Sequence, residues 1–293
     1  MKIFCNFKPV EFFDFFVEKY KQYPITIYWD YPVTEKNIDK NQINIFITHE
    51  PNELFQLHSW INYHQSSFDY ILSWNKDLIP LIDNLVEFPC SWRPNSSSVY
   101  EFLGKKKFEV SFLCGVKDLT EGHKLRHRIY KIEDKIKIPK KWYYVLDDFD
   151  HEKGVRPGYA EYSKELSNIP EEFKYEPSIW GKKFLYENSM FNIGVENVRK
   201  DNQINDRAWS CFASKVVPIY WGCSNLEEIG YDERGVIRFD NENELIDIIN
   251  NLTEKDYYDR LPYIEHNYQV SKRDTLEEKL CYVLDEIIKG HNL

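Results

Sequence analysis

A group of polar residues that could bind a phosphorylated ligand lies in the carboxyl-terminal half of the sequence. An apolar segment ends in the pair Glu196 and Asn197. After a short loop, a predicted helix begins with Asn205, Asp206 and Arg207. A helix N-terminus offers unpaired N–H groups and the positive end of a dipole, and an arginine can bind two phosphate oxygens at once. Because Asp206 can also accept hydrogen bonds from two ribose hydroxyls, the pattern suits a nucleoside diphosphate.

The start of this helix also has a purely structural interpretation. Asn205 can cap the helix, Asp206 can complement its dipole, and Arg207 can be solvated. The physical pattern alone leaves both interpretations open.

The elements that must position these residues follow from the alternation of apolar runs with helical periodicity. In the first half, the pattern predicts strands at 2–7, 25–29, 43–48 and 68–74 and helices at 10–20 and 54–63. In the second half, it predicts strands at 108–114, 142–146, 191–195, 216–221 and 235–239 and helices at 122–131, 206–214 and 244–252. Strands that alternate with helices indicate an α/β fold with parallel sheets.

A change of composition divides the two series of elements. The segment from Phe88 to Lys107 is rich in Pro, Ser and Lys, which is typical of a crossing between domains. We therefore predict one domain over residues 1–100 and a second over 101–270. The remaining residues, 271–293, are predicted to form a docking helix with apolar residues on one face and Thr275 and Glu278 as a capping box. In open α/β sheets, ligands bind at the carboxyl ends of the strands.

Composition and charge exclude several functional classes. The chain has 293 residues, of which 42% are hydrophobic, which is enough for a globular core. Its 38 basic and 48 acidic residues give a net charge of −10, which disfavours nucleic acid and anionic membranes as partners. Charged residues interrupt the apolar start, and no apolar run reaches the length of about 18 residues needed for a membrane span. The sequence therefore predicts a soluble, cytoplasmic protein.

Metal and redox motifs are weak or absent in the sequence. The cysteines show no CxxC spacing, and we expect all of them to be buried thiols: Cys5, Cys90, Cys114, Cys211, Cys223 and Cys281. The sequence contains none of three common motifs, HExxH, GxGxxG and GxxxxGK[ST]. Their absence argues against zinc enzymes, dinucleotide oxidoreductases and P-loop kinases, respectively. Asp147, Asp148 and Asp150 form an Asp-x-Asp pattern, which is either a metal ligand set or a solvated acidic loop.

Three consecutive motifs resemble the donor-binding region of the α1,3-fucosyltransferases, glycosyltransferase family ten. In that family, a strand ending in Phe-Glu-Asn-Ser/Thr leads to Tyr-Val/Ile-Thr-Glu-Lys and a helix, and then to a Val/Ile-Pro-Ile-Tyr-Trp-Gly strand. The corresponding segments here are Val195–Val198, Gln203–Arg207 and Val217–Gly222. The third matches almost letter for letter, whereas the second departs at Gln203, Asn205, Asp206 and Arg207, and the first at Val198.

The resemblance extends to segments outside this region. Ser111–Cys114, followed by Leu125 and Arg126, is similar to the family's first donor-domain strand and the arginine of the next helix. In the first half, Ile45–Glu50 followed by Phe68–Ile71 is similar to a strand that ends in glutamate and a later Phe-Asp-Tyr.

The resemblance implies a GT-B fold, in which two Rossmann-like, doubly wound domains face a central cleft. It implies inverting transfer of fucose from GDP-fucose to a hydroxyl of a glycan in an α1,3-type linkage, with no metal and no other cofactor required. The first domain would then lie on the acceptor side, and the second would bind the donor. Glu50 would be the general base, and the donor site would consist of Arg126, Glu196, Asn197, Asn205, Asp206 and Arg207.

Within that site, Arg126 and Arg207 would hold the diphosphate, Asp206 the ribose hydroxyls, and Asn197 another part of the nucleotide. Other residues compete for some of these roles. Asp30 is the second candidate for the base, because it too is an acid at the end of a predicted strand. Arg126 competes with its helix neighbours for the phosphate: His123, His127 and Arg128.

The altered second motif leaves two alternatives to the fucosyltransferase. Gln203 removes an aromatic stacking surface, and Asp206 and Arg207 keep the family's charges but change their reach. The chain could therefore be a GT-B glycosyltransferase that uses another nucleotide-sugar. It could also be a non-catalytic protein that binds a sugar nucleotide or a glycan.

Overall fold

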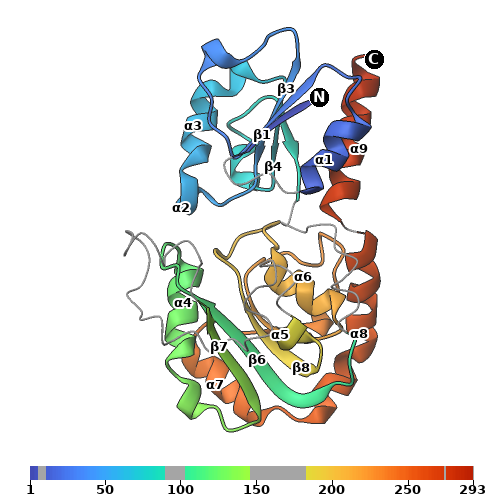
Figure 1. The fold of residues 1–293 in the computed structure, drawn as a ribbon. Coiled ribbons are helices and arrows are strands. Elements are labelled where there is room, and N and C mark those ends of the chain that lie inside the picture. Colours follow the sequence, from blue (N-terminus) through green and yellow to red (C-terminus); the bar gives the residue numbers. More distant parts are fainter. Residues whose placement is uncertain (6–10, 90–102, 146–182, 274, 293) are drawn as a thin grey trace. The chain divides into compact units, whose positions relative to one another are not determined.

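The computed structural model describes residues 1–5, 11–89, 103–145, 183–273 and 275–292. The chain forms two compact units (Figure 1). Unit 1 consists of Met1–Asn95, Lys200–Gln203 and Asp274–Leu293, and unit 2 of Ser96–Arg199 and Ile204–Arg273. The expected boundary near residue 100 and the acidic residues at 147, 148 and 150 lie outside the described residues.

Unit 1 contains a five-stranded parallel sheet whose strands follow the order of the sequence. The strands are β1 (Lys2–Cys5), β2 (Ile25–Trp29), β3 (Ile43–Thr48), β4 (Tyr70–Ser73) and β5 (Leu85–Glu87). β2 and β3 are entirely buried, because the sheet has an apolar cluster on each face. Successive side chains of a strand point to opposite faces, so neighbouring Ile45 and Phe46 belong to different clusters.

The helices of unit 1 are α1 (Glu11–Lys19), α2 (Asn52–Phe55), α3 (Leu57–His64) and α9 (Leu276–Gly290). The cluster that contains Ile45 includes residues of α1 and α9, and the Tyr20 hydroxyl donates a hydrogen bond of 2.9 Å to Asp285 of α9. The cluster that contains Phe46 includes Leu57 of α3. The carboxyl-terminal helix therefore packs on the amino-terminal sheet. Thr275 accepts the backbone N–H of Glu278, as expected for the cap of α9.

Unit 2 contains a second five-stranded parallel sheet in which the strand order reverses. The strands are β6 (Lys107–Gly115), β7 (Lys140–Val145), β8 (Ser189–Val195), β9 (Val217–Trp221) and β10 (Ile237–Arg238). Their order is β10-β9-β8-β6-β7. The chain passes from β6 to β7 on one side and then returns to β8 on the other side of β6. Ligands of open α/β sheets bind at the carboxyl ends of the strands at such a reversal, which here means β6 and β8.

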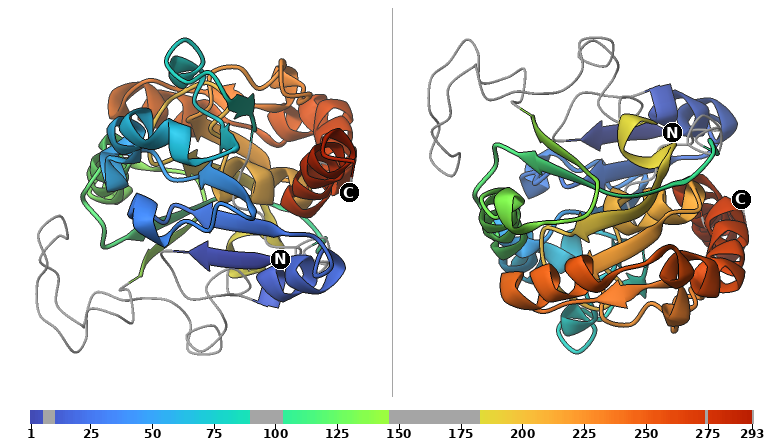
Figure 2. Two further views of the ribbon diagram at one scale, coloured as in Figure 1. Left: turned by 90° about the horizontal axis from the view of Figure 1, so that it is seen from above. Right: turned by 90° about the horizontal axis from the view of Figure 1, so that it is seen from below.

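The helices of unit 2 are α4 (Glu121–Tyr130), α5 (Lys183–Tyr186), α6 (Asp206–Ala213), α7 (Glu242–Asn251) and α8 (Glu254–Arg273). In Figure 2, right, the orange segments of α7 and α8 run beside the sheet. The sequence pattern predicts no helix at the position of α8, because Pro262 lies inside it and most of its positions are polar. The α/β class with two parallel sheets is confirmed by the structure.

The thiols differ partly from expectation. Cys114, Cys211 and Cys223 are buried thiols, as predicted, whereas Cys5 and Cys281 are only half-buried. Cys5 lies on the edge strand β1, which has a neighbour on one side only, and Cys281 lies on α9. Cys90 is outside the described residues.

The described residues contain no helix that is both long and apolar enough to cross a bilayer.

Candidate functional site

The start of α4 touches the loop that follows β8. The backbone N–H of Gly122 donates to the carbonyl oxygen of Asn197 at 3.0 Å. A Cβ on Gly122 would lie 1.7 Å from the carbonyl oxygen of Glu196, so only glycine allows this approach. Thr120 caps the helix: its hydroxyl accepts the N–H of His123, and its own N–H donates to the His123 ring. α4 is therefore fixed directly against the end of β8.

Arg126 on α4 reaches the carboxyl end of β8 and is buried. Its Nε donates to the carbonyl oxygen of Val195 at 2.9 Å, and its Nη2 donates to Oδ1 of Asn197 at 2.7 Å. A guanidinium has five N–H donors, and these bonds use two of them. The remaining donors have no hydrogen-bond partner among the described residues. They are available for an anionic ligand.

The competing basic residues of α4 have other partners. Arg128 is half exposed and forms an ion pair with Glu242 of α7. His127 is 3.0 Å from the carbonyl oxygen of Lys117. Burial, and then the positive charge of Arg126, lower the pKa of His123 to about 2, so that this ring is neutral in its capping role. Of the four candidates, the structure places Arg126 at the strand ends.

Glu196 is buried beneath the start of α6 and takes over its capping. One carboxylate oxygen accepts the backbone N–H groups of Asn205 at 3.1 Å and Ala208 at 3.4 Å. The Asn205 side chain, which was a candidate cap, makes no capping hydrogen bond. Burial, and then the charge of Asp206, raise the pKa of Glu196 to about 7. Because Glu196 occupies two of the N–H groups, the expected phosphate site at this helix terminus is partly filled by the protein itself.

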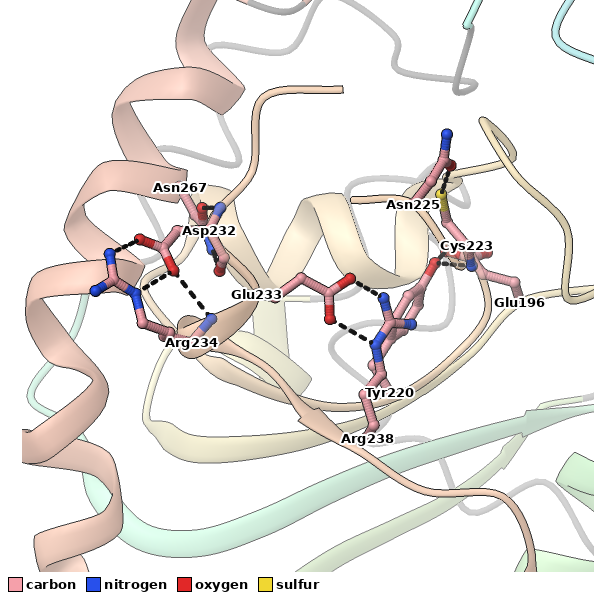
Figure 3. Close-up of polar contacts among 9 residues, drawn as sticks. All are labelled: Glu196, Tyr220, Cys223, Asn225, Asp232, Glu233, Arg234, Arg238 and Asn267. Atoms are coloured by element: carbon pink, nitrogen blue, oxygen red, sulfur yellow. Dashed lines mark hydrogen bonds and ion pairs between the residues drawn. The ribbon is translucent and has the colours of Figure 1, made fainter. Parts of the chain in front are cut away.

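Tyr220 connects Glu196 to the loop after β9. Its hydroxyl donates to Glu196 at 3.1 Å and accepts the backbone N–H of Cys223 at 3.0 Å (Figure 3). A Cβ on Gly222 would lie 2.4 Å from Cγ of Glu196, so glycine leaves the space that the carboxylate fills. The Tyr-Trp-Gly segment thus positions Glu196. Sequence reasoning identified this motif but assigned no role to Tyr220.

Arg207, the second residue of α6, lies at the end of β6. Its Nη1 donates to the carbonyl oxygen of Leu113 at 3.4 Å. Burial lowers the pKa of Arg207, but the neighbouring acidic groups, Asp206 first and then Tyr186 and Glu196, together outweigh this effect, and the pKa is raised. The pKa of Arg126 is lowered instead, first by burial and then by the positive charge of Arg207. The charge of Arg207 thus disfavours the protonated form of Arg126, and a bound anion would offset that repulsion.

The two candidates for the general base, Glu50 and Asp30, belong to unit 1. Glu50, the candidate base, lies two residues after the end of β3 and is half-buried. The six predicted donor-binding residues belong to unit 2. Asp30, the second candidate for the base, is fully buried. Gln203 also belongs to unit 1, although its sequence neighbours from residue 204 onward are in unit 2.

The described ranges contain His, Cys, Asp and Glu residues, whose side chains most often bind metal ions. No three or more His, Cys, Asp or Glu residues in these ranges gather as a metal site.

Comparison with known proteins gives structural likenesses only. No family model matches the chain, and no curated protein matches it in sequence. Crystal structures of an α1,3-fucosyltransferase with GDP-fucose, of an α1,3-fucosyltransferase, and of an α1,3-fucosyltransferase with GDP are each 15% identical to it. The first two cover 94% of this chain and 91% of their own, with TM-scores of 0.48 and 0.49. The third covers 95% and 92%, with a TM-score of 0.48.

Proposed function

We propose that this chain is an inverting GT-B glycosyltransferase that moves fucose from GDP-fucose to a hydroxyl of a glycan. The observation that carries the proposal is the pair Arg126 and Arg207 at the carboxyl ends of β8 and β6, where the strand order of unit 2 reverses. A diphosphate has the charge and the oxygen geometry that two guanidinium groups bind best. The order of the three sequence motifs around these arginines supports fucose as the sugar.

Five of the six residues of the proposed donor site have a defined task. Arg126 and Arg207 hold the diphosphate, and Asn197 orients Arg126 through the bond to Nη2. Asp206 accepts the ribose hydroxyls from the first turn of α6. Glu196 does not contact the donor in this proposal. It holds the N-terminus of α6, and therefore Arg207, in place.

The proposed reaction requires removal of a proton from the acceptor hydroxyl and stabilisation of the negative charge on the leaving diphosphate. The acceptor hydroxyl attacks the anomeric carbon, and Glu50 of unit 1 removes its proton as the bond to the diphosphate breaks. General base catalysis of this kind is typically worth about 10²–10⁴-fold in rate. The leaving diphosphate gains negative charge, which the two arginines stabilise where it develops. Unit 2 is thus the proposed donor-binding part and unit 1 the acceptor part, and no metal is required.

A panel of ligands tests the proposal. GDP, UDP, CMP and GDP-fucose are titrated into the purified protein by calorimetry, first with EDTA and then with Mn²⁺. Binding of GDP and GDP-fucose alone, unchanged by EDTA, followed by transfer of fucose to a saccharide, is the expected result. Selective binding of UDP or CMP would replace fucose by another sugar. Binding of GDP-fucose without hydrolysis or transfer would instead indicate a non-catalytic binding protein.

A further inference from the structure

The backbone that carries Glu50 is held by a buried carboxyl group from the neighbouring strand. Oδ1 of Asp30, the residue after β2, accepts the N–H of His49 at 2.8 Å. Both carboxyl oxygens lie 3.3 Å from the N–H of Glu50. The N–H of Asp30 in turn donates to the carbonyl oxygen of Ile47 at 2.9 Å, so that the end of β2 stays paired with β3.

The same peptide is held from the opposite side by β4. The indole N–H of Trp74, which follows β4 and is buried, donates to the carbonyl oxygen of His49 at 2.7 Å. One residue earlier, the hydroxyl of Thr48 donates to that of Ser73 at 2.6 Å. The N–H and C=O groups of His49 are therefore both fixed, one by each neighbouring strand. This leaves the backbone of Glu50 little freedom to move.

Two features of Asp30 are energetically unfavourable in the folded state. Its φ of 44° lies in the left-handed region, which non-glycine residues rarely adopt. Its carboxyl group is fully buried, and burial raises its pKa to about 8. Strained backbone and buried acids tend to occur at functional sites, where the surrounding structure holds them. The contacts of Asp30 are made to the peptide of the proposed base.

We propose that Asp30 and Trp74 are positioning residues that hold the main chain of Glu50 so that its carboxylate meets the acceptor hydroxyl in one fixed orientation. This inference rests on the proposed function, because it assigns Glu50 as the base. It also gives Asp30 a different role from that of a second base, since its carboxyl group is fully buried and hydrogen-bonded to backbone N–H groups.

Asp30→Asn is the test variant, because asparagine also tolerates a left-handed φ but replaces one carboxyl oxygen by an NH₂ group, which cannot accept a backbone N–H. Asp69→Asn is the matched control. Asp69 accepts the backbone N–H of Asn44 at 2.7 Å, a bond of the same type at the other end of β3. Trp74→Phe removes the hydrogen bond to the carbonyl oxygen of His49 while keeping an aromatic ring in place.

Transfer kinetics provide the first readout. Asp30→Asn and Trp74→Phe should each lower kcat by about 10- to 100-fold, as expected for a misplaced catalytic group. Their affinity for GDP should stay within about twofold of the wild type, because the effect is local to unit 1. In a Glu50→Gln background, Asp30→Asn should lower kcat no further. An equal loss of kcat in both backgrounds, or none in either, would overturn the proposal.

Amide hydrogen exchange separates this inference from the proposed function. The N–H groups of His49 and Glu50 should lose protection in Asp30→Asn but keep it in Asp69→Asn. If the wild type transfers no fucose, the proposed function fails, and exchange alone then decides whether Asp30 holds this peptide. Unchanged protection in Asp30→Asn would contradict the inference whatever the activity.

Discussion

Arg126 on α4 and Asn197 after β8 are joined by a hydrogen bond of 2.7 Å, although they are 71 residues apart in the sequence. Together with the bond from Arg126 to the carbonyl oxygen of Val195, this contact fixes a buried guanidinium at the reversal of the strand order. A cation that is held this rigidly loses little entropy when it binds an anion. The proposed donor site depends on that arrangement.

The close approach of α4 to the loop after β8 makes Gly122 irreplaceable. In Gly122→Ala, the new Cβ would lie 1.7 Å from a backbone oxygen, so α4 must move away from Glu196 and Asn197. We expect a loss of stability of at least about 1–3 kcal/mol, in the range typical of overpacking. The midpoint of urea unfolding measures this loss, and the affinity for GDP should fall with it.

Gly290→Ala is the control for this substitution. Gly290 is the last residue of α9, and a Cβ there would meet no atom within 4 Å. Alanine should therefore stabilise the protein by up to about 1 kcal/mol through its helix propensity. Equal effects of the two substitutions would show that the contact at Gly122 is not tight.

Arg207 is expected to act through its forked geometry as well as its charge. Arg207→Lys keeps the positive charge beside Asp206 but offers a single ammonium group in place of two parallel N–H donors. We expect GDP affinity to fall by about tenfold in Arg207→Lys and further in Arg207→Ala, the full loss of a charge-assisted bond being about 1.5–3 kcal/mol. Wild-type affinity in Arg207→Ala would remove this residue from the site.

The regular elements follow from the sequence where a strand is buried on both faces. The predicted bounds of β2 and β3 agree with the structure, because continuous apolar runs flanked by turn residues admit few alternatives. β5 has three residues and is only partly buried, so it carries no such signal. α8 is missed because Pro262 argues against a helix, whereas packing of Tyr257 and Ile264 in the core of unit 2 stabilises one.

The residues of the candidate site could be proposed from the sequence, but their contacts could not. Residue type and motif order point to Arg126, Asn197 and Arg207, which the structure places at the ends of β8 and β6. The capping of α6 by Glu196 depends on two segments that meet only in the folded chain. The contacts of Asp30 with residues after β3 likewise arise from strand pairing, which spacing alone does not specify.

The buried carboxyl group of Asp30 predicts a pH-dependent stability. Its pKa is raised from 3.8 to about 8, so the folded state holds the proton more tightly than the unfolded state. The contribution of Asp30 to the free energy of unfolding is therefore fully present at low pH and falls as pH rises from about 4 to about 8, by about 1.4 kcal/mol per unit.

Asparagine does not titrate, so Asp30→Asn isolates this effect. The stability of the wild type minus that of Asp30→Asn should become smaller as pH rises through this window, as measured by urea unfolding at several pH values. A difference that stays constant or grows with pH would show that Asp30 is ionised in the folded protein throughout.

Removal of the proposed base should separate binding from chemistry. Glu50→Gln keeps the size of the side chain but cannot accept the proton of the acceptor hydroxyl. We expect kcat for fucose transfer to fall by about 10²–10⁴-fold, with GDP affinity unchanged, because Glu50 belongs to unit 1 and the donor residues to unit 2. Full activity of Glu50→Gln would exclude Glu50 as the base.

GDP binding to two arginine variants of α4 tests directly whether Arg126 and Arg207 form a diphosphate site. GDP binding is measured by calorimetry, in EDTA, for the wild type, Arg126→Ala and Arg128→Ala. Arg128 lies on the same helix and has the same charge, but it pairs with Glu242. We expect a loss of affinity of about 10- to 100-fold for Arg126→Ala and almost none for Arg128→Ala. Equal affinities of the two variants, or no binding of GDP to the wild type, would contradict the diphosphate site.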